Sequence, residues 1–143
     1  VSDIVGPKGM VYAVEFSLQV ARKLVFLAET RPNIVPIIGD ARYPSKYISL
    51  VGSGVDVVYQ DVAQSDQARI LCDNMNVFSS FGGWGMIAIK ARSIDSASSV
   101  DKVYSKELSE LSRRGTEIVE NVDLAPLEKD HRFVIVRATE ELA

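Results

Sequence analysis

The sequence predicts an α/β fold with a mostly parallel sheet that ends in an antiparallel strand pair. Short β-branched apolar runs alternate with segments of helical periodicity, which is typical of parallel α/β proteins. The last two apolar runs are joined only by residues 125–130, and parallel neighbours need about a dozen or more connecting residues, so this pair is expected to be antiparallel. At 143 residues, the chain fits one domain, residues 1–143.

The first part of the chain predicts two strands joined by a helix. Residues 10–15 (MVYAVE) have the pattern of a strand, and Ser17 is a typical residue for capping a helix that runs to about Thr30. One face of this helix is expected to carry Val20, Leu24, Leu27 and Ala28. Residues 34–38 then form the next strand, and 42–54 a longer loop with a short helical turn.

The strand predicted at 55–59 is the one around which the rest of the chain is arranged. Its nearly continuous apolar run suits a strand buried on both faces of a parallel sheet, and it leads directly to Asp61. A helix is expected over 64–81, with Gly82 and Gly83 as its stop. The apolar stripe of this helix consists of Ala68, Leu71, Cys72, Met75 and Phe78.

The last third predicts a strand, a helix and the antiparallel pair. Residues 86–89 form a strand that brings Lys90 to its carboxyl end, and a helix follows from about 100 to 114. The final strands are expected at 116–124 and 133–136. A sheet closed in this way matches the Rossmann-like fold of S-adenosylmethionine-dependent methyltransferases better than that of dinucleotide dehydrogenases, although fold analogy alone is a weak argument for function.

Composition narrows the functional classes. The net charge is −3 with a pI near 5.2, so the chain does not attract nucleic acid by charge alone. One cysteine and one histidine argue against a zinc site, and no apolar run approaches the roughly 18 residues that a membrane span needs. Cys72 is expected to be a core residue in a reducing, intracellular setting.

Acidic residues follow three consecutive predicted strands. In nucleotide-binding α/β proteins an acid after the second strand holds ribose hydroxyls, a role that suits Glu15, while the adjoining Phe16 could lie against an adenine ring. Asp40 with Ala41 could contact the adenine edge. Asp61 has two interpretations at this point: it faces the ligand crevice beyond the strand, or it caps the helix that follows.

Two basic side chains lie at the predicted ends of other strands. Lys90 closes a strongly apolar strand, so it either extends to solvent or belongs to the site. His131 immediately precedes the last strand. A lone histidine is more often structural than catalytic, but its position beside the candidate site makes it a candidate for chemistry.

Five motifs are spread along the chain: YAVEFS (12–17), GDAR (39–42), DVAQ (61–64), GMIAIKARSID (85–95) and EKDH (128–131). Together they resemble fibrillarin, a family of S-adenosylmethionine-dependent ribose 2′-O-methyltransferases of rRNA and tRNA in box C/D guide RNA particles. The motif GMIAIKARSID is more similar to archaeal members of the family than to eukaryotic ones. The resemblance extends over essentially the whole chain.

The resemblance implies a site and a cofactor. By motif position the catalytic residues are Asp61, Lys90 and His131, and no metal is implied. S-adenosylmethionine would be bound by Glu15, Phe16, Asp40, Ala41, Asp61 and Gln64. A further catalytic lysine, the glycine-rich cofactor loop and one strand near the centre of the sheet are expected upstream of Val1.

The resemblance also implies partners: guide RNA and target RNA, a Nop-type scaffold protein and a kink-turn-binding ribosomal-type protein, with no membrane. The compartment would be the cytoplasm in an archaeon and the nucleolus in a eukaryote. One alternative is a non-catalytic fibrillarin-like subunit or fragment that docks on the particle scaffold. A dehydrogenase is disfavoured because no Gly-x-Gly-x-x-Gly pattern is visible.

Overall fold

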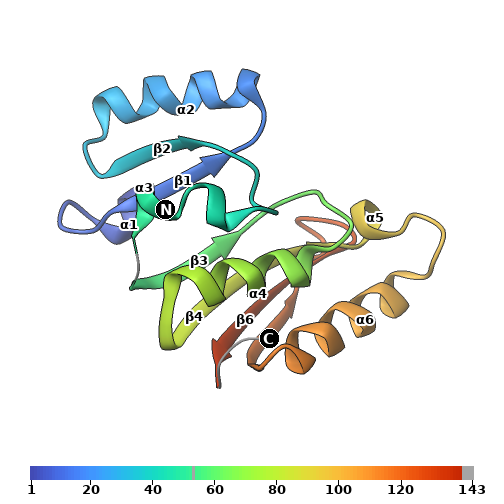
Figure 1. The fold of residues 1–143 in the computed structure, drawn as a ribbon. Coiled ribbons are helices and arrows are strands. Elements are labelled where there is room, and N and C mark those ends of the chain that lie inside the picture. Colours follow the sequence, from blue (N-terminus) through green and yellow to red (C-terminus); the bar gives the residue numbers. More distant parts are fainter. Residues whose placement is uncertain (53, 140–143) are drawn as a thin grey trace. The chain divides into compact units, whose positions relative to one another are not determined.

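The computed structural model describes the whole chain except residues 53 and 140–143. The described chain forms two compact units, Val1–Gly52 and Ser53–Ala143, each with its own sheet (Figure 1). The order of strands and longer helices agrees with the predicted β-α-β-loop-β-α-β-α-β-β arrangement. The prediction of a single domain over 1–143 stays a prediction.

The first unit is a two-stranded parallel sheet with a helix between its strands. Its sheet pairs β1 with β2, and Glu15 lies opposite Ile38 at the carboxyl ends of both strands. The elements are α1 (Ser2–Val5), β1 (Val11–Glu15), α2 (Leu18–Thr30), β2 (Ile34–Ile38), η1 (Pro44–Lys46) and α3 (Ile48–Val51). Both predicted strands, the helix and the helical turn in the following loop are therefore confirmed.

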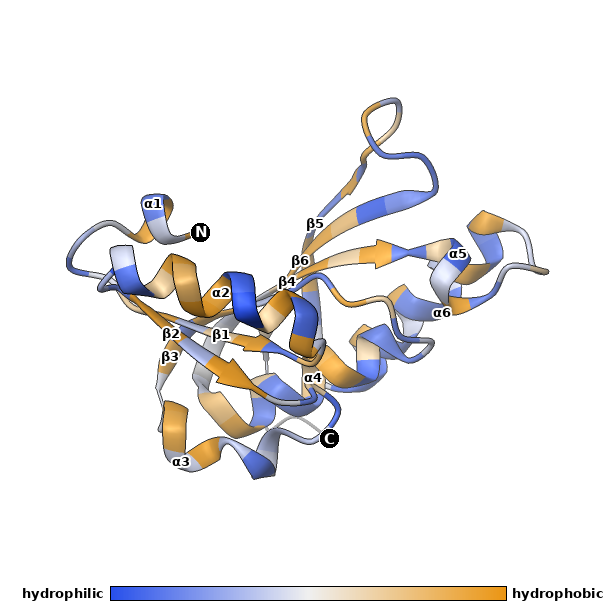
Figure 2. Ribbon diagram, turned by 90° about the horizontal axis from the view of Figure 1, so that it is seen from above, coloured by the Kyte–Doolittle hydropathy of each residue, from blue (hydrophilic) through white to orange (hydrophobic). Residues whose placement is uncertain are grey.

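Helix α2 starts as predicted, but only Leu24 and Ala28 of its predicted stripe are half-buried. Ser17 is its N-cap, and the Ser17 hydroxyl accepts a hydrogen bond from the backbone N–H of Val20 at 3.4 Å. Its most buried residue is Ala21, and Val20 and Leu27 of the predicted stripe are exposed. Figure 2 shows hydrophobic and hydrophilic residues alternating along α2. The apolar pattern located the helix correctly but was too broad to fix its rotation.

The second unit is a four-stranded mixed sheet in the order β3-β4-β6-β5. Strand β3 is parallel to β4, whereas β6 lies antiparallel between β4 and β5, which confirms the predicted terminal pair. The elements are β3 (Val55–Gln60), α4 (Gln67–Phe78), β4 (Ser79–Lys90), α5 (Ala91–Ile94), α6 (Val100–Arg113), β5 (Thr116–Asp123) and β6 (His131–Ala138).

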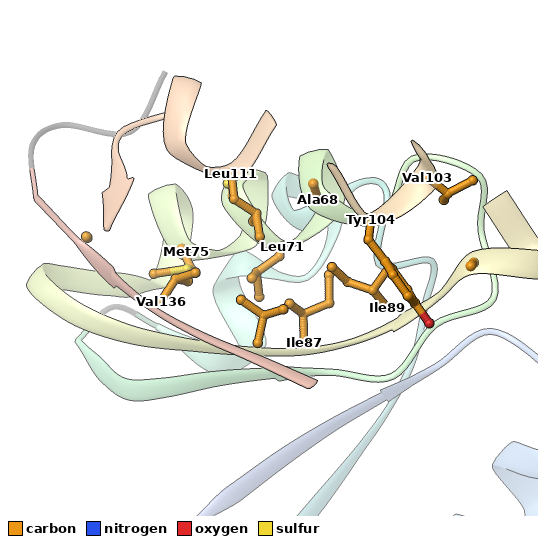
Figure 3. Close-up of a cluster of buried hydrophobic side chains, with 13 residues drawn as sticks. Ala68, Leu71, Met75, Ile87, Ile89, Val103, Tyr104, Leu111 and Val136 are labelled. Atoms are coloured by element: carbon orange, nitrogen blue, oxygen red, sulfur yellow. The ribbon is translucent and has the colours of Figure 1, made fainter. Parts of the chain in front are cut away.

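Helices α4 and α6 pack with this sheet around the main core (Figure 3). The predicted stripe of α4 is confirmed, because all five of its members are buried. Leu71 and Met75 of this stripe meet Ile87 of β4 and Val136 of β6 in one apolar cluster. Cys72 is buried there as expected, and burial raises the pKa of its thiol to about 12.

Two predictions about β3 and its surroundings were wrong. Strand β3 is not buried on both faces, since Val57 and Tyr59 are exposed. Helix α4 ends at Phe78, and Gly82 and Gly83 belong to β4. Gly82 has a φ of 76°, and the pairing of β3 with β4 shifts register nearby, so these glycines serve an irregular strand start and do not stop a helix.

Candidate functional site

In the first unit, two of the predicted acids lie at the same end of the β1–β2 sheet. The backbone N–H of Gly39, which precedes Asp40, donates to the carbonyl oxygen of Glu15 at 3.1 Å. The Glu15 carboxylate accepts a hydrogen bond from the backbone N–H of Ser17 at 2.7 Å through Oε1. The Phe16 side chain between them is mostly exposed. The parallel register therefore brings Glu15 and Asp40 to the same end of the sheet, at the carboxyl ends of its strands, as predicted.

Asp40 has a partner that sequence reasoning missed. Its carboxylate forms a bidentate ion pair with Arg42, with Nη2 to Oδ2 at 2.6 Å and Nε to Oδ1 at 3.1 Å. The Arg42 guanidinium holds the pKa of the Asp40 carboxyl below its usual range. Ala41, between them, is half-buried. The GDAR motif contained both residues, but periodicity gives no sign that they pair.

In the second unit, Asp61 and Lys90 meet beyond the carboxyl ends of β3 and β4. Lys90 Nζ lies 2.8 Å from Asp61 Oδ1, and the side chains are 24% and 51% exposed, respectively. Helix α4 begins six residues after Asp61 and has Asp66 as its N-cap. The structure therefore disfavours the capping interpretation of Asp61 and places Lys90 beside another candidate residue.

His131 is aligned with Lys90 by the sheet itself, since the two are register partners across β4 and β6. Its Nδ1 lies 2.7 Å from the carbonyl oxygen of Lys129. A carbonyl oxygen only accepts hydrogen bonds, so Nδ1 carries the proton in this contact. In the neutral ring Nε2 is then left as a hydrogen-bond acceptor.

Gln64 lies in the loop between Asp61 and α4, and its carbonyl oxygen accepts a hydrogen bond from Gln67 Nε2 at 2.9 Å. Gln67 itself is fully buried and was not predicted as part of any site. The only hint in the sequence is its spacing, four residues before Leu71 on the buried face of α4. A polar residue at such a position is expected to make internal hydrogen bonds.

The surroundings of the ion pair are partly apolar. The rings of Tyr59 and Phe133 lie with their centroids 6.3 Å apart, on the strands that lead to Asp61 and from His131. Burial and the Asp61 carboxylate raise the pKa of the Tyr59 hydroxyl. Among the described residues, no cluster of His, Cys, Asp and Glu side chains could hold a metal ion. No helix in the described part of the chain has the length and apolar character to cross a membrane.

The chemistry available at β3 and β4 is proton handling and orientation. A partly exposed carboxylate is paired with an ammonium group, and an imidazole with an acceptor nitrogen stands on the neighbouring strand. Glu15, Phe16, Asp40 and Ala41 belong to the first unit, whereas Asp61, Gln64, Lys90 and His131 belong to the second. Within each unit the structure brings the predicted residues to strand ends.

The comparisons with known proteins first define a class. Crystal structures of methyltransferases match the chain, and the mixed sheet has the Rossmann-like fold of S-adenosylmethionine-dependent methyltransferases. The family described as Fibrillarin matches residues 1–140. The chain therefore belongs to the fibrillarin family.

Individual relatives are similar over almost the whole chain. A fibrillarin-like rRNA/tRNA 2′-O-methyltransferase of Thermococcus sibiricus is 49% identical over 137 residues, which is 96% of this chain and 60% of that protein. Aeropyrum pernix fibrillarin with natively bound S-adenosyl-L-methionine matches with a TM-score of 0.84 and 46% identity, over 94% of this chain and 58% of that one.

A fibrillarin/Nop5p complex matches with a TM-score of 0.89 and 38% identity, over 95% of this chain and 65% of that one. The chain spans about 60% of the length of the curated archaeal relatives it matches.

Proposed function

We propose that this chain carries the catalytic residues of an S-adenosylmethionine-dependent ribose 2′-O-methyltransferase that acts on rRNA or tRNA. The observation that carries the proposal is the Asp61–Lys90 pair, 2.8 Å apart at the carboxyl ends of β3 and β4, with His131 in register beside it. The match of residues 1–140 to the fibrillarin family supports it. So do the activity named for the Thermococcus relative and the cofactor bound to the Aeropyrum one.

The proposed division of roles follows from the geometry. When bound, S-adenosylmethionine supplies a methyl group activated by the positive sulfonium. Asp61 accepts or orients the proton of the ribose hydroxyl, because its carboxylate is half exposed at the strand end. Lys90 fixes that carboxylate by a charge-assisted hydrogen bond. His131 presents Nε2 as an acceptor that can position the ribose.

The residues proposed to hold the cofactor suit its chemical parts. Glu15 is half-buried at a parallel strand end and uses Oε1 for the Ser17 N–H, so Oε2 is available to a ribose diol. The exposed ring of Phe16 suits stacking with an adenine. Asp40 and Ala41 are proposed for the adenine edge, with Arg42 holding the Asp40 carboxylate in place. Asp61 and Gln64 complete the proposed set.

We further propose that the RNA is presented by partners. A net charge of −3 gives the chain little attraction for phosphates, so substrate choice would come from a guide RNA and from proteins that hold it. A Nop-type scaffold is supported by the fibrillarin/Nop5p complex. A kink-turn-binding ribosomal-type protein is proposed from the family resemblance alone. The compartment would be the cytoplasm in an archaeon and the nucleolus in a eukaryote.

A non-catalytic subunit that docks on the scaffold is the second candidate. The match of the chain to a fibrillarin/Nop5p complex supports it. The Asp61–Lys90 pair favours the enzyme, because docking alone needs neither this pair nor an acceptor nitrogen beside it.

The first test is calorimetric titration of the chain with S-adenosylmethionine. We expect saturable binding that Glu15→Ala abolishes and that Glu29→Ala, which removes an exposed acid of α2, leaves intact. Equal binding by both variants would remove Glu15 from the site. Absence of binding by the unsubstituted chain would mean that these 143 residues alone do not form the whole cofactor site.

The second test is methyl transfer to a guided RNA in the assembled particle. A methylated 2′-hydroxyl no longer attacks its own phosphate, so the product is read as a nucleotide that resists alkaline cleavage. Particles that contain the chain, bind cofactor and leave the target cleavable would support the docking subunit instead.

A further inference from the structure

The side chain of Gln67 lies between two segments of the candidate site. It is 0% exposed, at the first position of α4. Its Oε1 accepts a hydrogen bond from the backbone N–H of Lys90 at 3.0 Å. Its Nε2 donates to the carbonyl oxygen of Gln64 at 2.9 Å. One buried amide therefore ties the end of β4 to the loop that carries Asp61.

The geometry of the sheet explains why Lys90 needs this contact. Strand β3 ends at Gln60, whose register partner on β4 is Ile87, so β4 continues for three residues beyond the pairing with β3. On its other side β4 stays paired with β6 as far as Lys90 and His131. At Lys90, the last residue of β4, Gln67 Oε1 thus accepts the backbone hydrogen bond that a carbonyl oxygen of a neighbouring strand would otherwise accept.

A second buried amide anchors Gln67 in turn. Gln60 is 6% exposed, and its Nε2 donates to the backbone carbonyl oxygen of Gln67 at 2.7 Å. The last residue of β3 therefore fixes the first residue of α4. Together, Gln60 and Gln67 link the segments immediately before and after Asp61 to the segment that ends at Lys90. Buried, hydrogen-bonded amides of this kind hold one arrangement of the backbone.

We propose that Gln67 is a positioning residue for the Asp61–Lys90 pair. It acts through the Lys90 backbone and the Gln64 loop and does not itself touch substrate. The inference rests on the proposed function, because it assigns Gln67 a part in holding the groups that handle the proton. A displacement of about 1 Å in such groups can cost a hundredfold in rate.

The experiment compares two nearly isosteric substitutions in the polypeptide that carries this chain, assembled with its partners. Gln67→Met removes both side-chain hydrogen bonds. Thr116→Val is the control: Thr116 is buried, and its hydroxyl donates to Leu111 O at 2.8 Å. It pairs with Ala138, at the opposite end of β6 from His131. Melting temperature, bound cofactor per chain, kcat and KM for the RNA are measured for each.

We expect Gln67→Met to lower kcat per cofactor-loaded chain by roughly tenfold to a hundredfold, with little change in KM for the RNA. Thr116→Val should lower the melting temperature and leave kcat per loaded chain within about twofold. Equal kcat in the two variants would overturn the positioning role, because a merely structural residue affects only the folded fraction.

Amide hydrogen exchange at Lys90 separates this inference from the proposed function. Gln67→Met should speed exchange of the Lys90 amide, whereas Thr116→Val should not. In one outcome, the unsubstituted particle is inactive while Gln67→Met still speeds exchange of the Lys90 amide. That result would contradict the proposed function but would support the contact between Gln67 and the Lys90 backbone. Unchanged exchange would overturn the inference whatever the activity.

Discussion

At the scale of single residues, a contribution to stability alone does not explain the Asp61–Lys90 pair. The Asp61 side chain is half exposed, and ion pairs in such positions typically contribute only about 0–1 kcal/mol. The pair nevertheless has close geometry, and the sheet places an imidazole beside it. A small contribution to folding together with convergent chemistry supports the proposal that these side chains serve the reaction.

Replacing Asp61 by alanine should therefore separate activity from stability. We expect Asp61→Ala to lose most turnover, by about a hundredfold or more if the carboxylate handles the proton. The free energy of unfolding should fall by no more than about 1 kcal/mol. Cofactor affinity should fall less than turnover. The measurements are methyl transfer in the particle, urea unfolding and calorimetry.

Asp56→Ala is the matched control for this substitution, since Asp56 is an exposed acid on the same strand, β3. It should leave turnover unchanged. Turnover of the Asp61 variant equal to that of the control would remove Asp61 from the mechanism.

At the scale of elements, helix α4 is held at its N-terminus by helix α6. Asp66, the N-cap, makes no side-chain capping hydrogen bond to any described residue. Glu107 of α6 supplies the acceptor instead, with Oε2 2.8 Å from the backbone N–H of Ala68. Glu107 is only 4% exposed, and burial raises the pKa of its carboxyl although the Ala68 hydrogen bond opposes this. The packing of α6 against α4 therefore buries the carboxyl group of Glu107.

This burial predicts a pH dependence of stability. Because the pKa of Glu107 is higher in the folded than in the unfolded chain, its stabilising contribution is complete below the unfolded value near 4.5 and is lost as the pH rises through the folded pKa. Relative to Glu107→Gln, the unsubstituted chain should therefore gain stability as the pH falls from neutral toward that range. Urea unfolding of both proteins across this interval measures the difference.

The contribution of the neighbouring Glu110 to stability cancels when the two proteins are compared. Hydrogen bonds from Arg113 and Arg114 lower the pKa of Glu110 to about 2, so its contribution is lost only as the pH falls toward that value. Both proteins keep Glu110, so its contribution is common to them. A stability difference that stays constant with pH would contradict the assigned titration of Glu107.

Elements were easier to predict from the sequence than contacts were. Strand β2 was predicted to the residue because Asn33 and Gly39 interrupt the apolar run on either side. Gly82 and Gly83 misled because glycine marks both helix ends and irregular strands. The candidate acids were placed at strand ends by the same reasoning. The Asp40–Arg42 pair and the buried amide of Gln67 depend on side-chain geometry, on which periodicity has no bearing.

At the scale of the whole molecule, the proposed cofactor residues are divided between the two compact units. Glu15, Phe16, Asp40 and Ala41 come from Val1–Gly52, and Asp61 and Gln64 from Ser53–Ala143. A ligand that binds only the native form stabilises whatever it contacts. The proposal therefore has a consequence for both units that does not depend on methyl transfer.

Saturating S-adenosylmethionine should slow amide hydrogen exchange in both units. The expected sites are the carboxyl ends of β1 and β2 in the first unit and the loop from Asp61 to Asp66 in the second. Glu15→Ala should remove the protection at the carboxyl ends of β1 and β2 at the same cofactor concentration, because the variant lacks a proposed contact to the cofactor. Glu29→Ala should keep it. Protection confined to one unit in the unsubstituted chain would contradict the assignment of cofactor residues to the other.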